Sequence, residues 1–334
     1  MDSLTQIVLG AAVGEAVAGK KLGNRAVLYG GILGTIPDLD VFVGKFYDIV
    51  TANDIHRGFS HSIAFFLLAS PLLAWSLKFL ERKNGLTLKE GFTMSFLCLL
   101  THALLDAFTN WGTQLFWPLD LRVSIQSIFV VDPLYTLPFL FCLIMAMRMK
   151  RTNPRRARWN RRGLIISSIY LLLTVGVQAY IRQHFHHSLK SRGIAYSQLS
   201  VRPAPLNIIL WNANVKVPDG YLLGEYSIFD TAPIDYRFFA KDSALVGSGI
   251  HTPMIQKLIR MSNDWYTLSK SGDKLYFNDL RFGLISEESA APEFVFRYEL
   301  RQNNGVWTGH EAESPSRREP GKLLRRLWKR MWGN

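Results

Sequence analysis

The first half of the chain contains four long apolar runs. Residues 62–80 include one charge, Lys78, near their end, and residues 163–181 include none. The other two runs extend over residues 92–108 and 133–147. Crossing about 30 Å of hydrocarbon takes roughly 20 helical residues, with about 17 as a lower limit. The pattern therefore predicts four spanning helices in a mainly α-helical membrane domain, a polytopic bundle.

Two shorter apolar segments precede these runs and flank a basic turn at residues 20–25. Each segment carries a pair of glycines four positions apart, Gly10 with Gly14 and Gly30 with Gly34. Small residues at this spacing allow membrane helices to approach closely. We therefore expect a short, tightly packed helical hairpin at the N-terminus.

The pattern changes after residue 181. Alternating apolar and polar positions, or β-branched and aromatic residues, predict strands at residues 207–217, 221–230, 274–281 and 293–300. Thr252 as a cap, followed by Pro253 at the first helical position, predicts a helix over residues 252–262. This part of the chain is expected to form a small α+β domain.

The patterns divide the chain into three parts. A helical membrane domain covers residues 1–182, an α+β domain covers residues 195–305, and a basic tail covers residues 306–334. Within the tail, residues 321–332 place Leu, Trp and Met among Arg and Lys at helical spacing. This spacing indicates an amphipathic helix on a membrane surface, and a disordered basic tail is the alternative.

The composition excludes several classes of protein. Hydrophobic residues make up 48% of the 334 residues, yet the formal net charge is +13. An aromatic content of 13% excludes disorder for most of the chain. The two cysteines, Cys98 and Cys142, lie in apolar runs, which excludes a disulfide scaffold. A nucleic-acid partner is not expected, because the basic residues gather beside the apolar runs.

The basic residues also predict the orientation in the membrane. The loops at residues 20–25, 81–91 and 148–162 contain fourteen Lys and Arg residues, whereas the alternate loops at 41–61 and 109–124 contain three. Short loops rich in Lys and Arg remain in the cytoplasm. The C-terminal domain is therefore expected to be extracytoplasmic.

Ionisable residues at the ends of the apolar runs gather at the outer face in this topology. They are Asp38, Asp40, His56, His61, His102, Asp106 and Asp132. Such residues are costly within or beside a membrane, so their convergence at one face indicates a functional site.

The spacing of four of these residues predicts a metal site. His102 and Asp106 are four residues apart and therefore share one face of a helix. His56 and His61 lie on either side of Gly58, in a loop that enters the next apolar run. Imidazoles with a carboxylate suit zinc, or manganese, better than calcium, which prefers oxygen ligands. We predict one divalent ion, with zinc favoured over manganese, on His56, His61, His102 and Asp106.

Three neighbouring residues are predicted to take part in catalysis. Asp38 or Asp40 would act as a general base or hold a second ion. Arg57 would pair with an anionic group such as a phosphate. A structural ion pair between Arg57 and a carboxylate of the protein is the alternative.

An ordered set of motifs carries a resemblance to a known family. The motifs are MDSLTQIVLGAAVGEA at residues 1–16, GTIPDLD at 34–40, HRGFSHS at 56–62, THALLDAFTNWGTQLFWP at 101–118 and VVDPLYT at 130–136. Together they resemble the YdjM-like family of inner-membrane proteins, which are assigned as metal-dependent hydrolases by inference and one of which is described as LexA-binding. The segments at 202–212 and 219–230 extend the resemblance, so that it covers most of residues 1–300.

The resemblance implies a bacterial inner-membrane protein with metal-binding His and Asp residues and an inferred hydrolase activity. The residues that match the family's motif positions are Asp38, Asp40, His56, His61, His102 and Asp106. Many members have His where this chain has Gln6. Here either a ligand is absent, or a hydrogen-bonding amide replaces a second metal.

The function expected from these observations is a membrane-bound, metal-dependent hydrolase. Its substrate would be a lipid or lipid-linked phosphoester at the outer face of the membrane, and membrane lipids would be partners. The alternative is a non-catalytic scaffold or regulator whose metal site braces the helices and whose C-terminal domain binds a protein. A pathway for ions is disfavoured, because the charges do not continue across the membrane.

Overall fold

The structure is a computed structural model that describes residues 1–286, 293–312 and 319–333. The chain divides into two compact units. The first consists of helices and comprises residues 1–43, 55–176 and 205–207. The second comprises residues 44–54, 177–204 and the chain from 208 onward, and contains two β-sheets.

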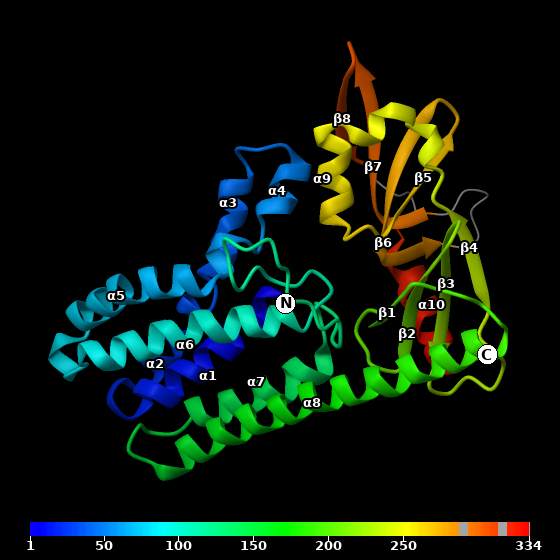
Figure 1. Ribbon diagram of the computed structural model, residues 1–334. Coiled ribbons are helices and arrows are strands. Elements are labelled where there is room, and N and C mark those ends of the chain that lie inside the picture. Colours follow the sequence, from blue (N-terminus) through cyan, green and yellow to red (C-terminus); the bar gives the residue numbers. More distant parts are fainter. Residues whose placement is uncertain (287–292, 313–318, 334) are drawn as a thin grey trace. The chain divides into compact units, whose positions relative to one another are not determined.

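Figure 1 shows the helices of the first unit. They are α1 (Ser3–Leu22), α2 (Asn24–Leu33), α3 (Asp40–Gly44), α5 (Ile63–Leu80), α6 (Leu88–Ala107), α7 (Pro133–Met147) and α8 (Pro154–Ser191), the last of which continues into the second unit. The 3-10 turns η1 (Pro37–Leu39), η2 (Phe59–His61) and η3 (Arg82–Asn84) precede α3, α5 and α6.

Glycines bring the backbones of α1 and α2 into direct contact. A Cβ atom on Gly10 would lie 2.3 Å from the Gly30 carbonyl oxygen, and one on Gly14 would lie 2.3 Å from that of Ala26. A Cβ atom on Gly34 would lie 2.8 Å from the Gln6 carbonyl oxygen. The hairpin therefore has the close approach that the glycine spacing predicts.

Polar side chains determine where the other helices begin. Ser62 caps α5, and Thr87 and Glu90 form a reciprocal capping box on α6. Asp132 caps α7 by accepting a hydrogen bond of 2.9 Å from the Leu134 amide, and it also accepts one from the Tyr170 hydroxyl. These contacts pair amide groups that the helix itself leaves open. Asp132, one of the predicted outer-face residues, thus has a structural role.

Two helices in the described residues are long and apolar enough to cross a membrane, α5 and α8. A third span results if α2 and residues 37–44, which are bent by 44° relative to each other, count as one. Helix α7 is apolar but has 15 residues. Leu72 on α5 and Leu172 on α8 are each 71% exposed, which suits surfaces that lipid covers. The first unit is therefore a helical membrane domain.

The second unit contains two antiparallel four-stranded sheets with their strands in chain order. The first sheet consists of β1 (Gln198–Pro203), β2 (Leu210–Val217), β3 (Gly220–Ser227) and β4 (Tyr236–Ala240). The second consists of β5 (Tyr266–Ser271), β6 (Lys274–Ser286), β7 (Glu293–Asn303) and β8 (Val306–Glu311). Helix α9 (Pro253–Met261) occupies the predicted helical segment and packs Ile255 and Leu258 against the second sheet.

Two further helices belong to the second unit. The short helix α4 (Ile49–Ile55) buries Val50 beside Leu258 and Tyr298, although it comes from the loop between α3 and η2. Helix α10 (Pro320–Met331) packs Met331 against Leu210, and Arg330 donates to both carboxylate oxygens of Asp230 at 2.7 Å. Residues 313–318 and Asn334 of the predicted tail lie outside the described residues.

Replacing Gly30 by alanine should destabilise the membrane domain. The new Cβ atom would lie 2.2 Å from the Gly10 carbonyl oxygen, and overpacking of this kind costs about 1–3 kcal/mol. The thermal unfolding temperature of the purified protein should therefore fall. Gly176→Ala is the matched control, because no atom lies within 4 Å of a Cβ at this helical glycine. Equal unfolding temperatures for the two variants would contradict the role of the glycine contact.

Candidate metal centre

Four side chains from three elements converge at one end of the helical unit. His102 and Asp106 lie one turn apart on α6, His61 ends η2, and Asp38 lies in η1. One potential ligand atom from each lies within 4.8 Å of the others. His61, His102 and Asp106 are buried, whereas the Asp38 side chain is 26% exposed. The group is therefore accessible to solvent mainly at Asp38.

The nitrogen and oxygen atoms of these four side chains lie close together. Nε2 of His61 lies 3.2 Å from Nε2 of His102. Oδ1 of Asp38 lies 3.4 Å from both nitrogens. Oδ2 of Asp106 lies 3.7 Å from His61 Nε2 and 3.9 Å from His102 Nε2. Two imidazoles and two carboxylates therefore surround one small space.

The partners of the two Nδ1 atoms determine the tautomers. The Gly34 carbonyl oxygen can only accept, so His102 Nδ1 donates to it at 2.6 Å. The Ser60 hydroxyl donates to Asp40 at 2.8 Å and therefore accepts from His61 Nδ1 at 2.9 Å. In each neutral ring, Nε2 then carries a lone pair and no hydrogen. Metal-binding histidines have this same arrangement, with Nδ1–H held by an oxygen.

His61 is suited to stay neutral. Burial lowers the pKa of His61 to about 4, against the opposing effect of the nearby Asp38 carboxylate. A neutral imidazole is the form that binds a metal. Oδ2 of Asp106 is buried and accepts no aligned hydrogen bond within the described chain. Lone pairs that face one another in a buried space repel unless a cation lies between them, so these residues fit a divalent ion.

Other groups hold Asp106 in place. Oδ1 accepts hydrogen bonds from the Met1 amino group and, at 2.9 Å, from Gln6 Nε2. The Arg57 Nε lies 2.9 Å from Oδ2. Gln6 therefore helps to position Asp106. Arg57 lies in an ion pair with this carboxylate, and its Nη1 also donates to Thr109 Oγ1 at 3.0 Å.

The structure places His56 outside the group of four. Its Nδ1 lies 2.8 Å from Asp40 Oδ1. Oδ2 of Asp40 accepts from the Arg57 amide at 3.0 Å and from the Ser60 hydroxyl. Asp40 thus organises the loop that carries both histidines, with Arg57 in the left-handed region at φ 62°. Ser60, which sequence reasoning missed, connects Asp40 to His61; its position beside His61 in the HRGFSHS motif was the available indication.

A cavity of about 300 Å³ opens beside the group. Asp38, His56 and Arg57 line it, together with Leu39 and Val41. Leu39 is 50% exposed and Val41 is 49% exposed. The cavity therefore combines polar and charged groups with an exposed apolar wall.

The comparisons with known proteins give one match. The family profile described as "YdjM inner membrane protein" matches residues 1–185. Neither the curated proteins nor the solved structures include a match to the chain. The matched region contains the whole His/Asp group, the glycine hairpin and most of α8. The chain therefore belongs to the YdjM family of inner membrane proteins.

Proposed function

We propose that the protein is a membrane-bound, metal-dependent hydrolase. The observation that carries the proposal is the convergence of Asp38, His61, His102 and Asp106 with both Nε2 atoms free to accept a cation. Two imidazoles with two carboxylates favour zinc, with manganese as the second choice. A divalent ion held there would lower the pKa of a bound water to about 7 and so supply a nucleophile at neutral pH.

His56 is proposed to move the proton. Asp40 accepts from His56 Nδ1, which leaves Nε2 as the acceptor. His56 also lines the cavity beside Asp38. The pair can therefore take a proton from the attacking water and return it to the leaving group, with Asp40 orienting the ring.

The cavity supports a lipid or lipid-linked phosphoester as the substrate. Arg57 lines the cavity and can contact a phosphate while it pairs with Asp106. Leu39 and Val41 offer an apolar wall for a hydrocarbon chain. A membrane domain around the site would deliver such a substrate directly from the bilayer.

Variants of the proposed metal ligands and a variant of the proposed general base should differ in zinc content, although both should lose activity. His102→Ala and Asp106→Asn should lose bound zinc and activity together, because each removes a proposed ligand. His56→Ala should keep the zinc and lose roughly 100-fold in kcat, as expected for loss of a general base. Elemental analysis of the purified full chain, together with product release from phospholipids and a phosphodiester, measures both.

His187→Ala is the matched control, because His187 is an exposed histidine on α8 outside the group of four. Zinc that persists undiminished in His102→Ala and Asp106→Asn would refute the metal site. A structural metal centre would be indicated instead by two results together: the variants lose both zinc and thermal stability, and the wild type hydrolyses none of the substrates.

We further propose that α5, α6, α7 and α8 all span the inner membrane, with the metal centre and the C-terminal domain on the extracytoplasmic side. The support is the excess of Lys and Arg in the loops at residues 20–25, 81–91 and 148–162, compared with the loops at 41–61 and 109–124. Single cysteines at positions 155 and 240 should then react differently with an impermeant maleimide on intact cells. Only the cysteine at 240 should be labelled. Cys98 and Cys142 are buried and provide the background; labelling at 155 would invert the topology.

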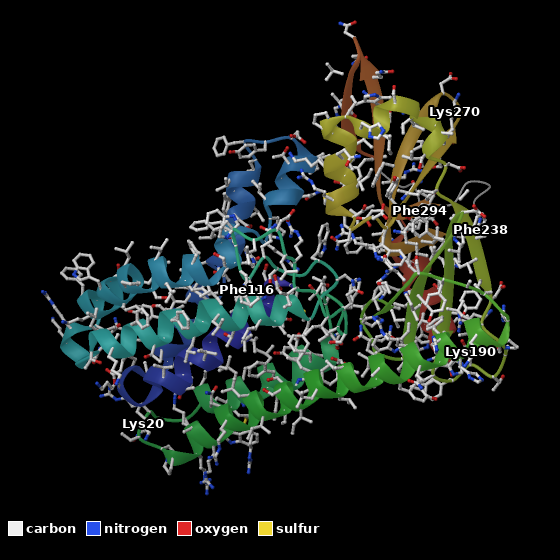
Figure 2. The ribbon with its side chains drawn as sticks, viewed as in Figure 1. Lys20, Phe116, Lys190, Phe238, Lys270 and Phe294 are labelled. Atoms are coloured by element: carbon white, nitrogen blue, oxygen red, sulfur yellow. The ribbon has the colours of Figure 1, made fainter. Side chains whose placement is uncertain are left out.

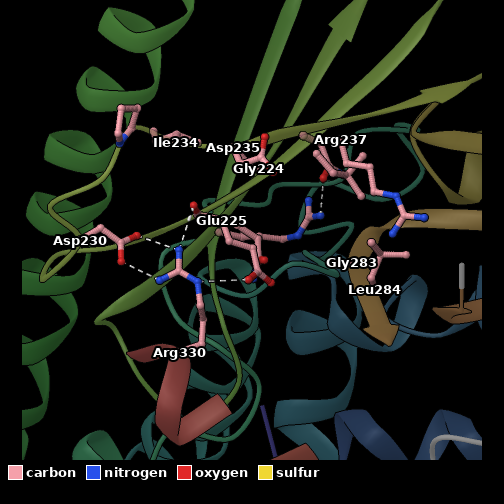
Figure 3. Close-up of a pocket in the computed structure, with 15 residues that line it drawn as sticks. Gly224, Glu225, Asp230, Ile234, Asp235, Arg237, Gly283, Leu284 and Arg330 are labelled. Carbon is pink, nitrogen blue, oxygen red and sulfur yellow. Dashed lines mark hydrogen bonds and ion pairs between the residues drawn. The ribbon is translucent and has the colours of Figure 1, made fainter. Parts of the chain in front are cut away.

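A binding role for the C-terminal domain is the second candidate function. This domain contains a cavity of about 280 Å³ whose lining includes Arg202, Asn214, Glu225 and Arg330. Figure 3 shows the cavity, with Glu225 and Arg330 labelled. The register pairs Arg202 with Asn212 and Asn212 with Glu225, so these side chains share one face of the first sheet. That face is polar at the cavity.

Arg202 gives this cavity its binding potential. Its Nη2 donates to Asn214 Oδ1 at 2.8 Å and to the Leu280 carbonyl oxygen at 2.6 Å. Its Nη1 is buried and has no hydrogen-bond partner within the described chain. Burial lowers the pKa of Arg202, against the opposing charge of Asp279. A carboxylate or carbonyl oxygen from a protein partner would complete the hydrogen bonds of this guanidinium.

Replacing Arg202 by methionine should abolish binding of short peptides with free C-termini and leave zinc content unchanged. Fluorescence polarisation of a labelled peptide library on the full chain measures the binding, and the same peptides with amidated C-termini are the control. Thr308→Val, a substitution on the second sheet away from the cavity, should bind like the wild type. Equal binding by Arg202→Met would exclude the guanidinium as the recognition group.

A further inference from the structure

A second cavity of the helical unit lies at the opposite end of α1 from the metal centre. It has a volume of about 600 Å³, and α1, residues 151–153 and the first turns of α8 enclose it. Gln6, which contacts Asp106, and Lys20, which lines this cavity, are separated by fourteen helical residues, or about 21 Å along the axis. Figure 2 labels Lys20 at that remote end of α1. The cavity is therefore distinct from the proposed catalytic site.

Glu15 is the one carboxylate among the described residues that line this cavity, and an ion pair with Arg156 neutralises it. Arg156 Nε and Nη2 each donate to Glu15 at 2.6 Å, and both side chains are almost completely buried. Gly19 leaves the room for this pair, since a Cβ there would lie 2.3 Å from the Glu15 carboxylate. The paired charges form the floor of the cavity and contribute no net charge to it.

Three further cations line the same cavity, Lys20, Arg151 and Arg161. Lys20 and Arg161 have no ion pair within the described residues. Arg151 is positioned by a hydrogen bond of 2.7 Å from its Nη1 to the Lys21 carbonyl oxygen. The lining thus carries a net charge of three positive units, in a concave site that favours an anion.

An uncharged group in the cavity also lacks a partner. Asn160 is 3% exposed, and its Nδ2 donates to the Ala12 carbonyl oxygen at 2.9 Å. Its Oδ1 is buried and has no hydrogen-bond partner among the described residues. A hydroxyl group on the ligand would provide the missing donor. Apolar groups of Ala16, Ala157 and Leu164 also contribute to the lining.

We propose that this cavity binds the headgroup of an anionic phospholipid. The three cations match the phosphate charge, Asn160 matches a glycerol hydroxyl, and Leu164 begins the apolar part of α8 along which an acyl chain can lie. Basic pockets between membrane helices bind lipid headgroups through the same combination of charge and apolar surface. The headgroup also links the basic loop at residues 148–153 to α1.

Native mass spectrometry of the detergent-solubilised full chain tests the proposal, with added phosphatidylglycerol, cardiolipin and phosphatidylethanolamine as probes. The wild type should retain one anionic lipid and no phosphatidylethanolamine at the same activation energy. The triple variant Lys20→Gln, Arg151→Gln, Arg161→Gln should bind the anionic lipid roughly 10- to 100-fold more weakly. Arg161→Glu changes one exposed residue and should also weaken binding of the anionic lipid. This variant keeps the test valid if the triple variant misfolds.

The matched control removes three charges outside the cavity, by Lys150→Gln, Arg155→Gln and Arg158→Gln, all of which are exposed. This control should retain the lipid. Equal loss in the two triple variants would mean that only overall charge matters and would overturn the site. Inorganic pyrophosphate that displaces the lipid and binds as tightly by itself would identify a soluble phosphate ligand and would equally overturn the lipid assignment.

Discussion

The backbone contact between α1 and α2 is the constraint on which the metal centre depends. Because glycines let the two helices touch, the end of α2 lies against α6, and the Gly34 carbonyl oxygen reaches His102 Nδ1 at 2.6 Å. The same contact places Gln6 of α1 beside Asp106. One carbonyl sets a tautomer and one amide holds a carboxylate, so the hairpin orients both α6 ligands. A side chain larger than hydrogen at Gly30 or Gly34 would move these groups apart.

Charge is separated along the first unit. Acidic and imidazole groups gather at the end that contains Asp106, whereas Arg and Lys gather at the end that contains Arg156. The same constraint applies at both ends, because a buried charge is costly unless it is paired. At one end Glu15 and Arg156 neutralise each other. At the other, Arg57 and the Met1 amino group pair with Asp106, while Asp38 and Asp40 add negative charge that neither of them pairs with, and this charge favours a divalent cation.

The boundary between the two units does not follow the order of the sequence. Residues 44–54 lie between Asp40 and His56 in the sequence, yet they pack in the second unit, where Asn53 Nδ2 donates to the Tyr298 hydroxyl at 3.2 Å and Lys257 donates to Thr51 at 2.7 Å. Helix α8 likewise has residues in both units. The loop that carries the two histidines is therefore bounded on one side by a segment that the C-terminal domain holds.

The sequence alone determined the features that depend on local periodicity. The apolar runs, the glycine spacing, the start of the helix at Pro253–Met261 and the shared face of His102 and Asp106 all follow from residues that are adjacent or about four positions apart in the chain. Only the tertiary structure decided which side chains from the loops lie beside His102 and Asp106. Asp38 faces the two Nε2 atoms, whereas His56 faces Asp40. The division of the C-terminal domain into two sheets and the burial of Val50 were also decided there. The physical reason is that loop direction and strand pairing arise from contacts between residues far apart in the chain, which no local pattern records.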